Sequence, residues 1–233
     1  MNEQTRQTAL ITGASQGLGR ALAHALADAG WNLILDARGA QALEGVKDEL
    51  AARTRVAAIV GDVTDPAHCH TLAQAAAECG GVDALINNAG ALGPSPQPRL
   101  LDYPLDVLEQ VYRTNAFAPL RLIQALRHQL GRGARIINIT SDAAVQGYEG
   151  WGGYGSSKAA LEQLSHVLAA EHPEWKVYWV DPGDMRTAMH QAAFPGEDIS
   201  DRPLPQESVP GLIALLKGKL PSGRYQAREL PSS

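Results

Sequence analysis

Short apolar runs alternate with longer helical patterns along this chain. The runs are rich in β-branched and aliphatic residues and are apolar on both faces, which is typical of strands in a parallel sheet that helices cover on each side. Because helical segments separate neighbouring runs, we expect parallel strands joined by helical crossovers. These strands are expected at 8–13, 31–38, 56–63, 82–90, 134–141 and 176–183.

Helical patterns fill the intervals between the runs. In the first interval Leu18, Leu22 and Leu26 recur at every fourth position, and neighbouring alanines keep this apolar stripe narrow, so that helix and sheet can approach closely. Gly30 follows the stripe and suits the C-terminal end of a helix. The alternation predicts right-handed crossovers and a doubly wound parallel sheet with helices on both faces. Similar helices are expected at roughly 40–52, 66–79, 104–130, 154–171 and 207–217.

Composition and charge narrow the possible classes of function. With 45% apolar and 19% charged residues, the chain is expected to be globular. A net charge of −5 without a basic block argues against nucleic acid as a partner. The chain also lacks an apolar run long enough to span a membrane, so we do not expect a membrane partner. Nothing in composition divides the chain, and we expect a single domain over 1–233, with 92–98 and 194–205 as excursions from it.

The two cysteines and the first residues bear on location. Cys69 and Cys79 do not suggest a disulfide framework, and the start of the chain lacks the charged and apolar segments of a signal peptide. The cytoplasm is therefore the expected location. His68, Cys69 and His70 are consecutive, but the chain has no second ligand pair at zinc spacing. We do not expect a metal site there.

A glycine-rich segment, TGASQGLG at 12–19, follows the first expected strand and opens the first expected helix. Gly13 permits a tight turn, Gly17 lets the backbone approach a ligand, and Gly19 allows the helix to pack closely on the strand. The helix N-terminus offers N–H groups and a positive dipole end to a pyrophosphate. The segment predicts a dinucleotide site; a glycine-rich turn without a ligand is the alternative.

Further motifs occur in the order and spacing of one enzyme family. The motifs are GDV at 61–63, NNAG at 87–90, Asn115, Ser141, YGSSK at 154–158 and PGDMRT at 182–187. Together with the glycine turn, they resemble the short-chain dehydrogenase/reductase family of the Tyr-x-x-x-Lys type, over residues 8 to about 190. The resemblance implies a Rossmann-like α/β fold with a sheet of about seven strands.

Tyr154 and Lys158 stand four residues apart, so on a helix they share one face. A carbonyl that is reduced by hydride needs a proton as negative charge develops on its oxygen. An ammonium about 5 Å from the phenol favours phenolate by roughly 3 kcal/mol at an effective dielectric constant of about 20, which predicts that Lys158 lowers the pKa of Tyr154 by about two. We expect Tyr154 to be a general acid/base; an ordinary surface pair is the alternative.

The resemblance implies roles for other residues. Lys158 would also hydrogen-bond the nicotinamide ribose, and Ser141 would hydrogen-bond the substrate oxygen, where the alternative is a serine that ends a strand. The implied catalytic residues are Asn115, Ser141, Tyr154 and Lys158. The implied cofactor-binding residues are Gly13, Ser15, Gln16, Gly17, Leu18, Gly19, Arg38, Asp62, Val63, Asn88, Ala89, Gly90, Tyr154, Lys158, Pro182, Gly183 and Thr187.

The end of the second expected strand indicates which dinucleotide is used. The resemblance places Ala37 where NAD-dependent relatives have an acidic residue, and Arg38 where others have an arginine for the 2′-phosphate of NADP. A guanidinium suits phosphate well. Asp36 would oppose a phosphate if the strand turned slightly differently, and Gln16 lacks the positive charge of many NADP-preferring relatives. We expect NADP(H) to be preferred modestly, with NAD(H) also possible; an Arg38 that is merely solvated is the alternative.

These residues together predict an oxidoreductase that transfers hydride between NADP(H) and a small or medium carbonyl or secondary alcohol. Two alternatives remain, which are an epimerase or dehydratase type of reaction on the same fold and a dinucleotide-binding regulatory protein. An apolar mouth is expected from Tyr148, Trp151, Met185, Met189 and Phe194. The alternative is that these side chains only pack loops onto the domain.

The long helix expected at 104–130 carries two further expectations. Pro119 has no N–H for the carbonyl of Asn115, so the helix should kink near 115–119 and leave that carbonyl free. The resemblance also implies pairing of helices between subunits in a homodimer or homotetramer; packing against the sheet is the alternative for the same side chains. The candidates are Leu101, Leu105, Leu108, Val111 and the stretch 122–126.

Overall fold

The strands form one parallel sheet whose order differs from their order along the chain. The computed structural model describes residues 6–231, and the sheet order is β3-β2-β1-β4-β5-β6-β7. The order reverses at β1, as the alternating pattern predicted for a doubly wound sheet. The strands are β1 (Thr8–Thr12), β2 (Asn32–Ala37), β3 (Val56–Val60), β4 (Val82–Asn87), β5 (Leu130–Ile139), β6 (Lys176–Asp181) and β7 (Gly223–Gln226).

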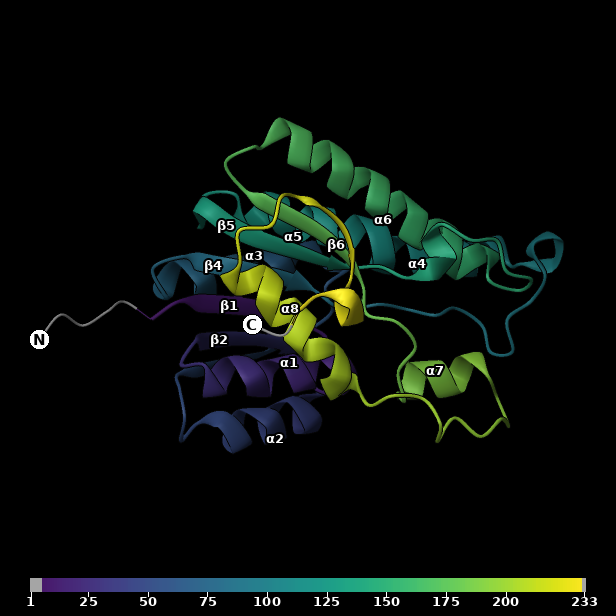
Figure 1. Cartoon of the computed structure of the whole chain (residues 1–233), viewed down its shortest axis with the longest axis horizontal. Coiled ribbons are helices and arrows are strands. Elements are labelled where there is room, and N and C mark those ends of the chain that lie inside the picture. Colours follow the sequence, from purple (N-terminus) through teal and green to yellow (C-terminus); the bar gives the residue numbers. More distant parts are fainter. Residues whose placement is uncertain (1–5, 232–233) are drawn as a thin grey trace, which may run out of the picture.

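Helices cover both faces of the sheet, and Figure 1 shows α7 apart from these layers, on the side toward which the strands run. The helix expected at 104–130 is divided by a π-helical turn, Arg113–Phe117. α7 lies in a segment where no helix was predicted. The helices are α1 (Gly17–Asp28), α2 (Ala40–Leu50), α3 (Pro66–Glu78), α4 (Leu105–Tyr112), α5 (Ala118–Leu126), α6 (Gly152–Glu171), α7 (Ala188–Ala193) and α8 (Val209–Lys217).

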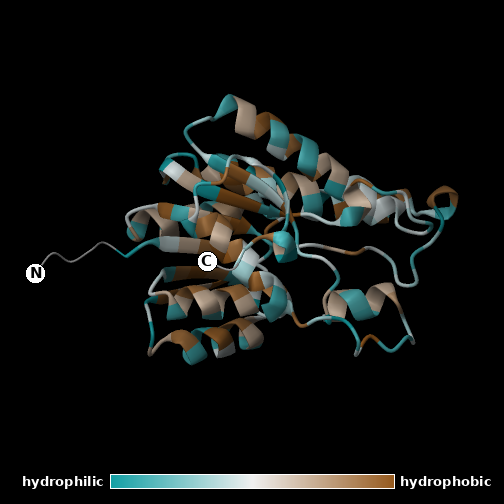
Figure 2. Cartoon of the chain, viewed as in Figure 1, coloured by the Kyte–Doolittle hydropathy of each residue, from teal (hydrophilic) through white to brown (hydrophobic). Residues whose placement is uncertain are grey.

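Two hydrophobic clusters hold the layers together, one on each face of the sheet. Leu10 belongs to the cluster that includes α3 and α5, and Ile11 to the one that includes α1, α2 and α8. Successive residues of a strand point to opposite faces, so a strand that is covered on both sides is apolar throughout. Figure 2 shows this as brown strands between helices whose apolar and polar residues alternate.

The side chains proposed for subunit pairing differ in their exposure to solvent. Leu101 and Leu105 are 99% and 73% exposed. Val111, Leu122 and Leu126 are buried inside the subunit, so the alternative of core packing applies to them, and Leu108 is half-buried. They pack as core because α4 and α5 turn this stripe toward the sheet and α6. Within residues 6–231, no helix is both long and apolar enough to cross a membrane.

Candidate active site

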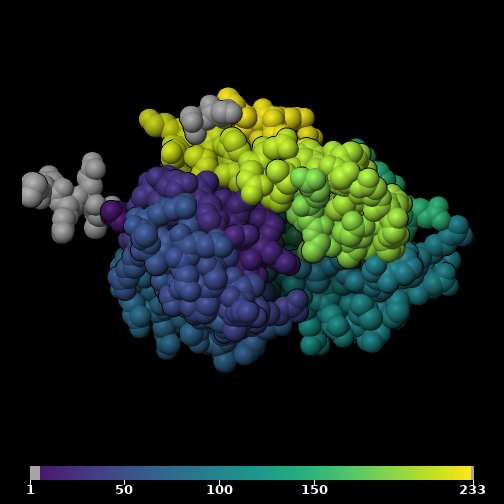
Figure 3. All heavy atoms as spheres, turned by 90° about the horizontal axis from the view of Figure 1, so that it is seen from below, coloured from purple at the N-terminus to yellow at the C-terminus, as the bar shows by residue number. Residues whose placement is uncertain are grey.

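A cavity of about 1420 Å³ lies at the carboxyl ends of the strands, the edge where ligands gather in open α/β sheets. Figure 3 shows the surface hollowed between the purple N-terminal part and the yellow-green segment near α7. Gly19 and Asn115 are the two predicted residues outside the lining. The predicted residues that line it are Gly13, Ser15, Gln16, Gly17, Leu18, Arg38, Asp62, Val63, Asn88, Ala89, Gly90, Ser141, Tyr154, Lys158, Pro182, Gly183 and Thr187.

The glycine turn between β1 and α1 brings backbone to one end of this cavity. Gly13 and Gly17 have φ of 65° and 55°, in the region that favours glycine. A Cβ on Gly19 would lie 2.4 Å from the Gly13 carbonyl oxygen, so Gly19 serves close packing rather than ligand contact. The first N–H groups of α1 have no partners within the helix, which suits them to a phosphate.

Thr12 and Asn88 fix this turn against the end of β4. The Thr12 hydroxyl oxygen accepts from the backbone N–H groups of Asn88 and Ala89, each at 3.0 Å. The Asn88 side-chain amide donates to the carbonyls of Thr12 and Gly13 at 2.9 and 3.1 Å. The NNAG segment therefore supports the turn, which the motif alone could not reveal.

Asn115 lies in the π-helical turn and is fully buried. Its side chain bonds both backbone groups of Ala91, at 2.7 Å to N and 2.8 Å to O, and donates to the Ser157 hydroxyl at 2.9 Å. The π-helical turn interrupts the long helix at Arg113–Phe117, next to Pro119. A kink at 115–119 and a free Asn115 carbonyl stay predictions.

A chain of buried polar side chains holds α6 to the sheet. Asn87 of β4 donates to Asn138 of β5 at 2.7 Å, and Asn138 donates to the Ser165 hydroxyl of α6 at 2.8 Å. Ser165 donates to the Leu161 carbonyl at 2.7 Å. A buried polar network of this kind specifies one position of the helix, because sliding would leave its members unpaired.

Tyr154 and Lys158 lie at the start of α6 and are 9% and 3% exposed. The Lys158 ammonium donates to the Ile139 carbonyl at 2.7 Å and lies 5.6 Å from the centre of the Tyr154 ring. Burial lowers the pKa of Lys158 to about 8. Burial also raises the pKa of Tyr154, and Asp181 and Asp142 raise it further. The expected lowering of the Tyr154 pKa is therefore wrong here, because burial and two carboxylates act on the phenol while the ammonium faces a carbonyl.

Ser141 ends β5 beside an acidic residue that the sequence did not single out. Its hydroxyl donates to the Asp142 carboxylate at 2.8 Å and accepts from the Ala143 N–H at 3.2 Å. The Tyr148 hydroxyl donates to the other Asp142 oxygen at 3.0 Å. Asp142 thus connects Ser141 with the loop at the cavity mouth.

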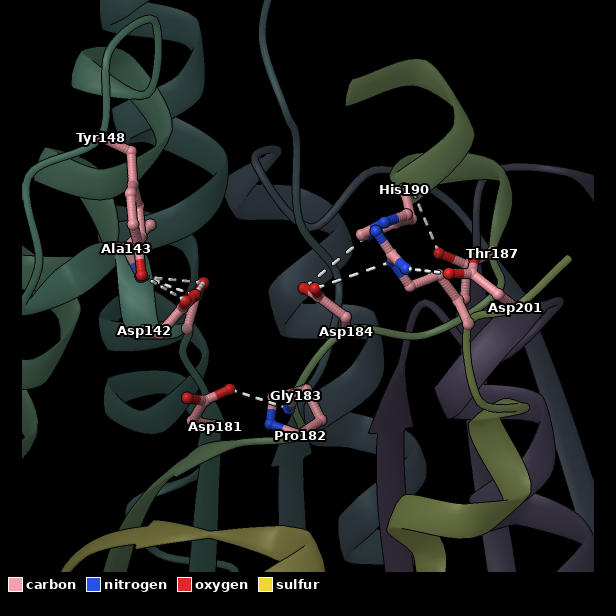
Figure 4. Close-up of polar contacts among 12 residues, drawn as sticks. Asp142, Ala143, Tyr148, Asp181, Pro182, Gly183, Asp184, Thr187, His190 and Asp201 are labelled. Carbon is pink, nitrogen blue, oxygen red and sulfur yellow. Dashed lines mark hydrogen bonds and ion pairs between the residues drawn. The ribbon is translucent and has the colours of Figure 1, made fainter. Parts of the chain in front are cut away.

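Asp181 and Asp184 add two carboxylates to this end of the cavity. Figure 4 shows Asp142 with Tyr148 on one side, Asp184 with His190 on the other, and Asp181 between them. Burial raises the pKa of Asp181, and the charge of Asp142 adds to this. The His190 ring lies 3.9 Å from the Asp184 carboxylate. Three acidic side chains, Asp142, Asp181 and Asp184, therefore line the same end of the cavity as Tyr154.

Two arginines near the C-terminal end of the described chain bind the segments that carry these carboxylates. Arg224 of β7 donates to the Ser141 carbonyl at 3.2 Å, binds Glu162 at 3.0 Å and lies 3.7 Å from Asp181. Arg228 donates to the carbonyls of Pro182 and Asp184 at 3.2 and 2.8 Å. The sequence analysis missed both arginines, because no local motif marks residues whose partners are so distant along the chain.

At the opposite end of the cavity, Arg38 is exposed and lines the wall with Asp62. Asp36 is 1% exposed, and its carboxylate lies 2.6 Å from the His68 ring nitrogen Nε2. Cys69 instead donates to the Val63 carbonyl at 3.3 Å, so His68 and Cys69 have separate partners. Among the described residues, no group of three or more acidic, histidine or cysteine side chains could hold a metal ion.

Aromatic side chains form the mouth over Tyr154. Trp151 contacts Tyr154 edge-on, with ring centres 5.8 Å apart, and lies 5.9 Å from Phe194 at the end of α7. All five side chains that were expected at the mouth line the cavity. The lining therefore agrees with an apolar mouth and not with side chains that only pack loops, and Tyr148 and Met189 are also exposed to solvent.

Known proteins resemble this chain over most of its length. The family model for short chain dehydrogenase matches residues 7–198. The chain is 35% identical over 178 residues to 1-deoxy-11-beta-hydroxypentalenate dehydrogenase of Streptomyces arenae, which covers 74% of this chain and 62% of that protein. It is 36% identical over 217 residues to sulfoacetaldehyde reductase 2 of Chromohalobacter salexigens, with 88% of this chain and 85% of that protein covered.

Solved structures agree with the sequence matches. A short chain dehydrogenase from Shigella flexneri 2a str. 301, complexed with NADP, superimposes with a TM-score of 0.88 at 29% identity. The alignment covers 95% of this chain and 97% of that one.

Proposed function

The chain belongs to the short-chain dehydrogenase/reductase family, and from this premise we propose that it transfers hydride between NADP(H) and a small or medium carbonyl or secondary alcohol. One observation carries the proposal: Tyr154 and Lys158 are buried together at one end of a cavity whose other end is the glycine turn. One relative is named as a dehydrogenase and another as a reductase, which supports this class of reaction.

The residues of this chain fit a nicotinamide dinucleotide, which supplies or accepts the hydride when bound. A Cβ on Gly13 would lie 3.0 Å from the Ala89 backbone, so the turn has no room for a larger residue beside that backbone. The turn and the α1 N-terminus would hold the pyrophosphate. Pro182 and Gly183 line the other end, where the nicotinamide would lie, and Thr187 lies against Gly17 of the turn.

Tyr154 acts as the proton donor to a carbonyl oxygen. Its raised pKa keeps the phenol protonated at neutral pH, and this is the form that can donate as negative charge develops. The Ser141 hydroxyl would turn from Asp142 to the same oxygen and stabilise it by a second hydrogen bond. Lys158 holds a positive charge beneath the Tyr154 ring and would contact the ribose.

NADP(H) is proposed over NAD(H) because of Arg38. Its guanidinium is exposed within the cavity wall, next to Ala37 in place of an acidic residue. The Asp36 carboxylate, which would oppose a phosphate, is buried against His68. The similar protein solved with NADP adds support.

A panel of aldehydes and ketones, followed by the nicotinamide absorbance with NADPH and with NADH, tests the proposal. We expect turnover of at least one carbonyl class, faster with NADPH at low cofactor concentration. Tight cofactor binding without turnover of any carbonyl or alcohol would instead favour a regulatory protein. Conversion of a substrate without net cofactor oxidation would favour the epimerase or dehydratase type.

We also propose that the protein is a cytoplasmic homodimer or homotetramer. The exposed Leu101 and Leu105 support self-association near α4, and the unpaired thiols of Cys69 and Cys79 fit a reducing compartment. Light scattering at micromolar concentration should give a multiple of the subunit mass, and a Leu101→Glu/Leu105→Glu variant should reduce it. A monomer mass for the unaltered protein would contradict the proposal.

A further inference from the structure

Asp36 and His68 form a buried pair for which the hydride transfer itself has no use. Asp36 ends β2 and His68 lies in the first turn of α3, and their side chains are 1% and 7% exposed. The His68 Nε2 and the Asp36 carboxylate oxygen are 2.6 Å apart. Burying two such groups is costly unless each satisfies the other, so the pairing fixes where both side chains point.

Gly61 leaves the space that the His68 ring occupies. A Cβ at this position would lie 2.1 Å from His68 Nδ1. Gly61 itself lines the cavity directly after β3. The ring therefore sits in a slot beneath the cavity wall, and its position depends on a glycine in a neighbouring strand end.

The backbone of Asp36 is held from the glycine turn as well. The Ala14 N–H donates to the Asp36 carbonyl at 2.9 Å. Burial raises the pKa of Asp36 to about 6, while the His68 contact and the nearby Gly13 N–H oppose this rise. At neutral pH the group is thus a carboxylate that is paired with His68.

This pair lies next to the residue that would recognise a phosphate. Asp36 and Arg38 are two positions apart, and Arg38 is the first residue after β2, where the chain leaves the sheet. Asp36, Arg38 and Asp62 all line the same end of the cavity. A carboxylate released from His68 could turn toward that end and add a negative charge where a 2′-phosphate would lie.

We propose that His68 is a positioning residue for cofactor choice, which holds the Asp36 carboxylate beneath the glycine turn and thereby leaves Arg38 to meet a 2′-phosphate. The inference rests on the proposed use of NADP(H). It states that His68 helps the protein to distinguish an adenosine ribose that carries the 2′-phosphate from one that does not. His68 touches neither phosphate nor substrate and acts through Asp36.

Calorimetric binding of two fragments tests this without any turnover. Adenosine 2′,5′-bisphosphate and 5′-AMP differ only in the 2′-phosphate. The ratio of their dissociation constants therefore measures how much the 2′-phosphate contributes to binding. We expect His68→Leu to weaken bisphosphate binding about tenfold, an effect of about 1.4 kcal/mol, with AMP binding almost unchanged. The exposed His70, on the same helix, provides the control His70→Leu, which should leave the ratio unaltered.

Rescue variants separate this role from a merely structural one. Asp36→Asn combined with His68→Leu should restore the ratio, because the carboxylate that His68→Leu releases is then absent and Asp62 is the same in every variant. His68→Gln keeps an amide N–H near the position of Nε2 and should retain most of the discrimination. Equal weakening of both fragments without rescue would overturn the proposal.

A second measurement covers the case in which His68→Leu does not fold. Asp36→Asn alone should change the ratio of the two dissociation constants less than about twofold, because His68 already holds the carboxylate away from the phosphate site. A gain of about tenfold in bisphosphate binding would contradict the proposal. The unaltered protein separates the two hypotheses. If it binds both fragments equally, the proposed NADP(H) preference fails, whereas an unchanged ratio in His68→Leu refutes the role of His68.

Discussion

The two ends of the cavity differ in how far apart along the sequence their residues lie. At the glycine-turn end, residues 12–19 form a continuous stretch that bonds to the ends of two neighbouring strands, at Asn88 and Asp36. At the tyrosine end, Ser141, Tyr154 and Asp181 meet from three elements, and Arg224 binds a carbonyl 83 residues away along the chain. The first end is governed by local backbone geometry, while the second depends on charges that only the folded chain brings together.

The difference has a chemical consequence. Backbone shape at the glycine turn follows from residue type, since φ above zero suits glycine. The pKa values of Tyr154 and Lys158 follow instead from burial and from carboxylates on other elements. Each end can therefore be tested by a change that should leave the other intact.

The largest effect is expected from Tyr154→Phe, which removes the proton donor but keeps the ring. We expect kcat to fall by about 10²–10⁴-fold, the usual contribution of a general acid, while the dissociation constant of NADPH stays almost unchanged. Steady-state kinetics and fluorescence titration measure the two quantities. Tyr148→Phe is the matched control, because Tyr148 bonds Asp142 but is half exposed. Retention of more than about a tenth of kcat would remove Tyr154 from this role.

Arg38→Ala tests the opposite end of the cavity. A charged hydrogen bond contributes about 1.5–3 kcal/mol, so the NADPH dissociation constant should rise by about tenfold to a hundredfold, and that of NADH should hardly change. Arg53→Ala provides a control, because Arg53 pairs with Asp28 on the surface. Similar losses for both cofactors would show that Arg38 does not recognise the 2′-phosphate.

Arg224→Met tests whether the tyrosine end depends on distant charges. The change leaves Glu162, which is 13% exposed, and Asp181 without their cation. We expect the free energy of unfolding in urea to fall by about 1–2 kcal/mol, with a few-fold loss of kcat. Arg113→Met should cost at most about 0.5 kcal/mol, because its pair with Glu109 is exposed. Equal effects of the two changes would mean that the β7 contact is only a surface pair.

The smallest effect is a pH dependence of stability. Lys158 has a pKa of about 8 in the folded protein against 10.5 in an exposed lysine. Between these values the unfolded chain binds more protons, so the free energy of unfolding should rise with pH through this group. Relative to Lys158→Met, we expect the protein to gain about 1 kcal/mol from pH 8 to 9 in urea denaturation. A constant difference between the two proteins would exclude a depressed Lys158 pKa.

Most of the fold could be predicted from the sequence, because burial on both faces of the sheet leaves a visible apolar pattern. β7 was not located, since Gly223–Gln226 has no apolar run and is only half-buried. The π-helical turn was anticipated through Pro119, which removes one N–H from the helix. α7 is too short to show a helical period.

The residues of the candidate site also fall into those that the sequence could predict and those that it could not. Motif residues such as Ser141 and Tyr154 could be placed at the cavity because their spacing is a family property. Asp142 and Arg224 could not, because their effect depends on distances that spacing does not encode. His68 was considered only as a metal ligand, and its pairing with Asp36 across 32 residues has no local signal.

The buried hydrogen-bonded network of Asn87, Asn138 and Ser165 bears on which segment of the molecule can be replaced, in evolution or by engineering. It anchors α6 to the sheet through Ser165, more than two turns beyond Tyr154, so the helix that carries Tyr154 has a support apart from the loops at the mouth. Segment 185–205 contributes the facing wall without any bond to this chain of amides. Grafting a different segment there, with Thr187 retained for the cofactor, should therefore alter which molecules are accepted while the chemical step is inherited unchanged.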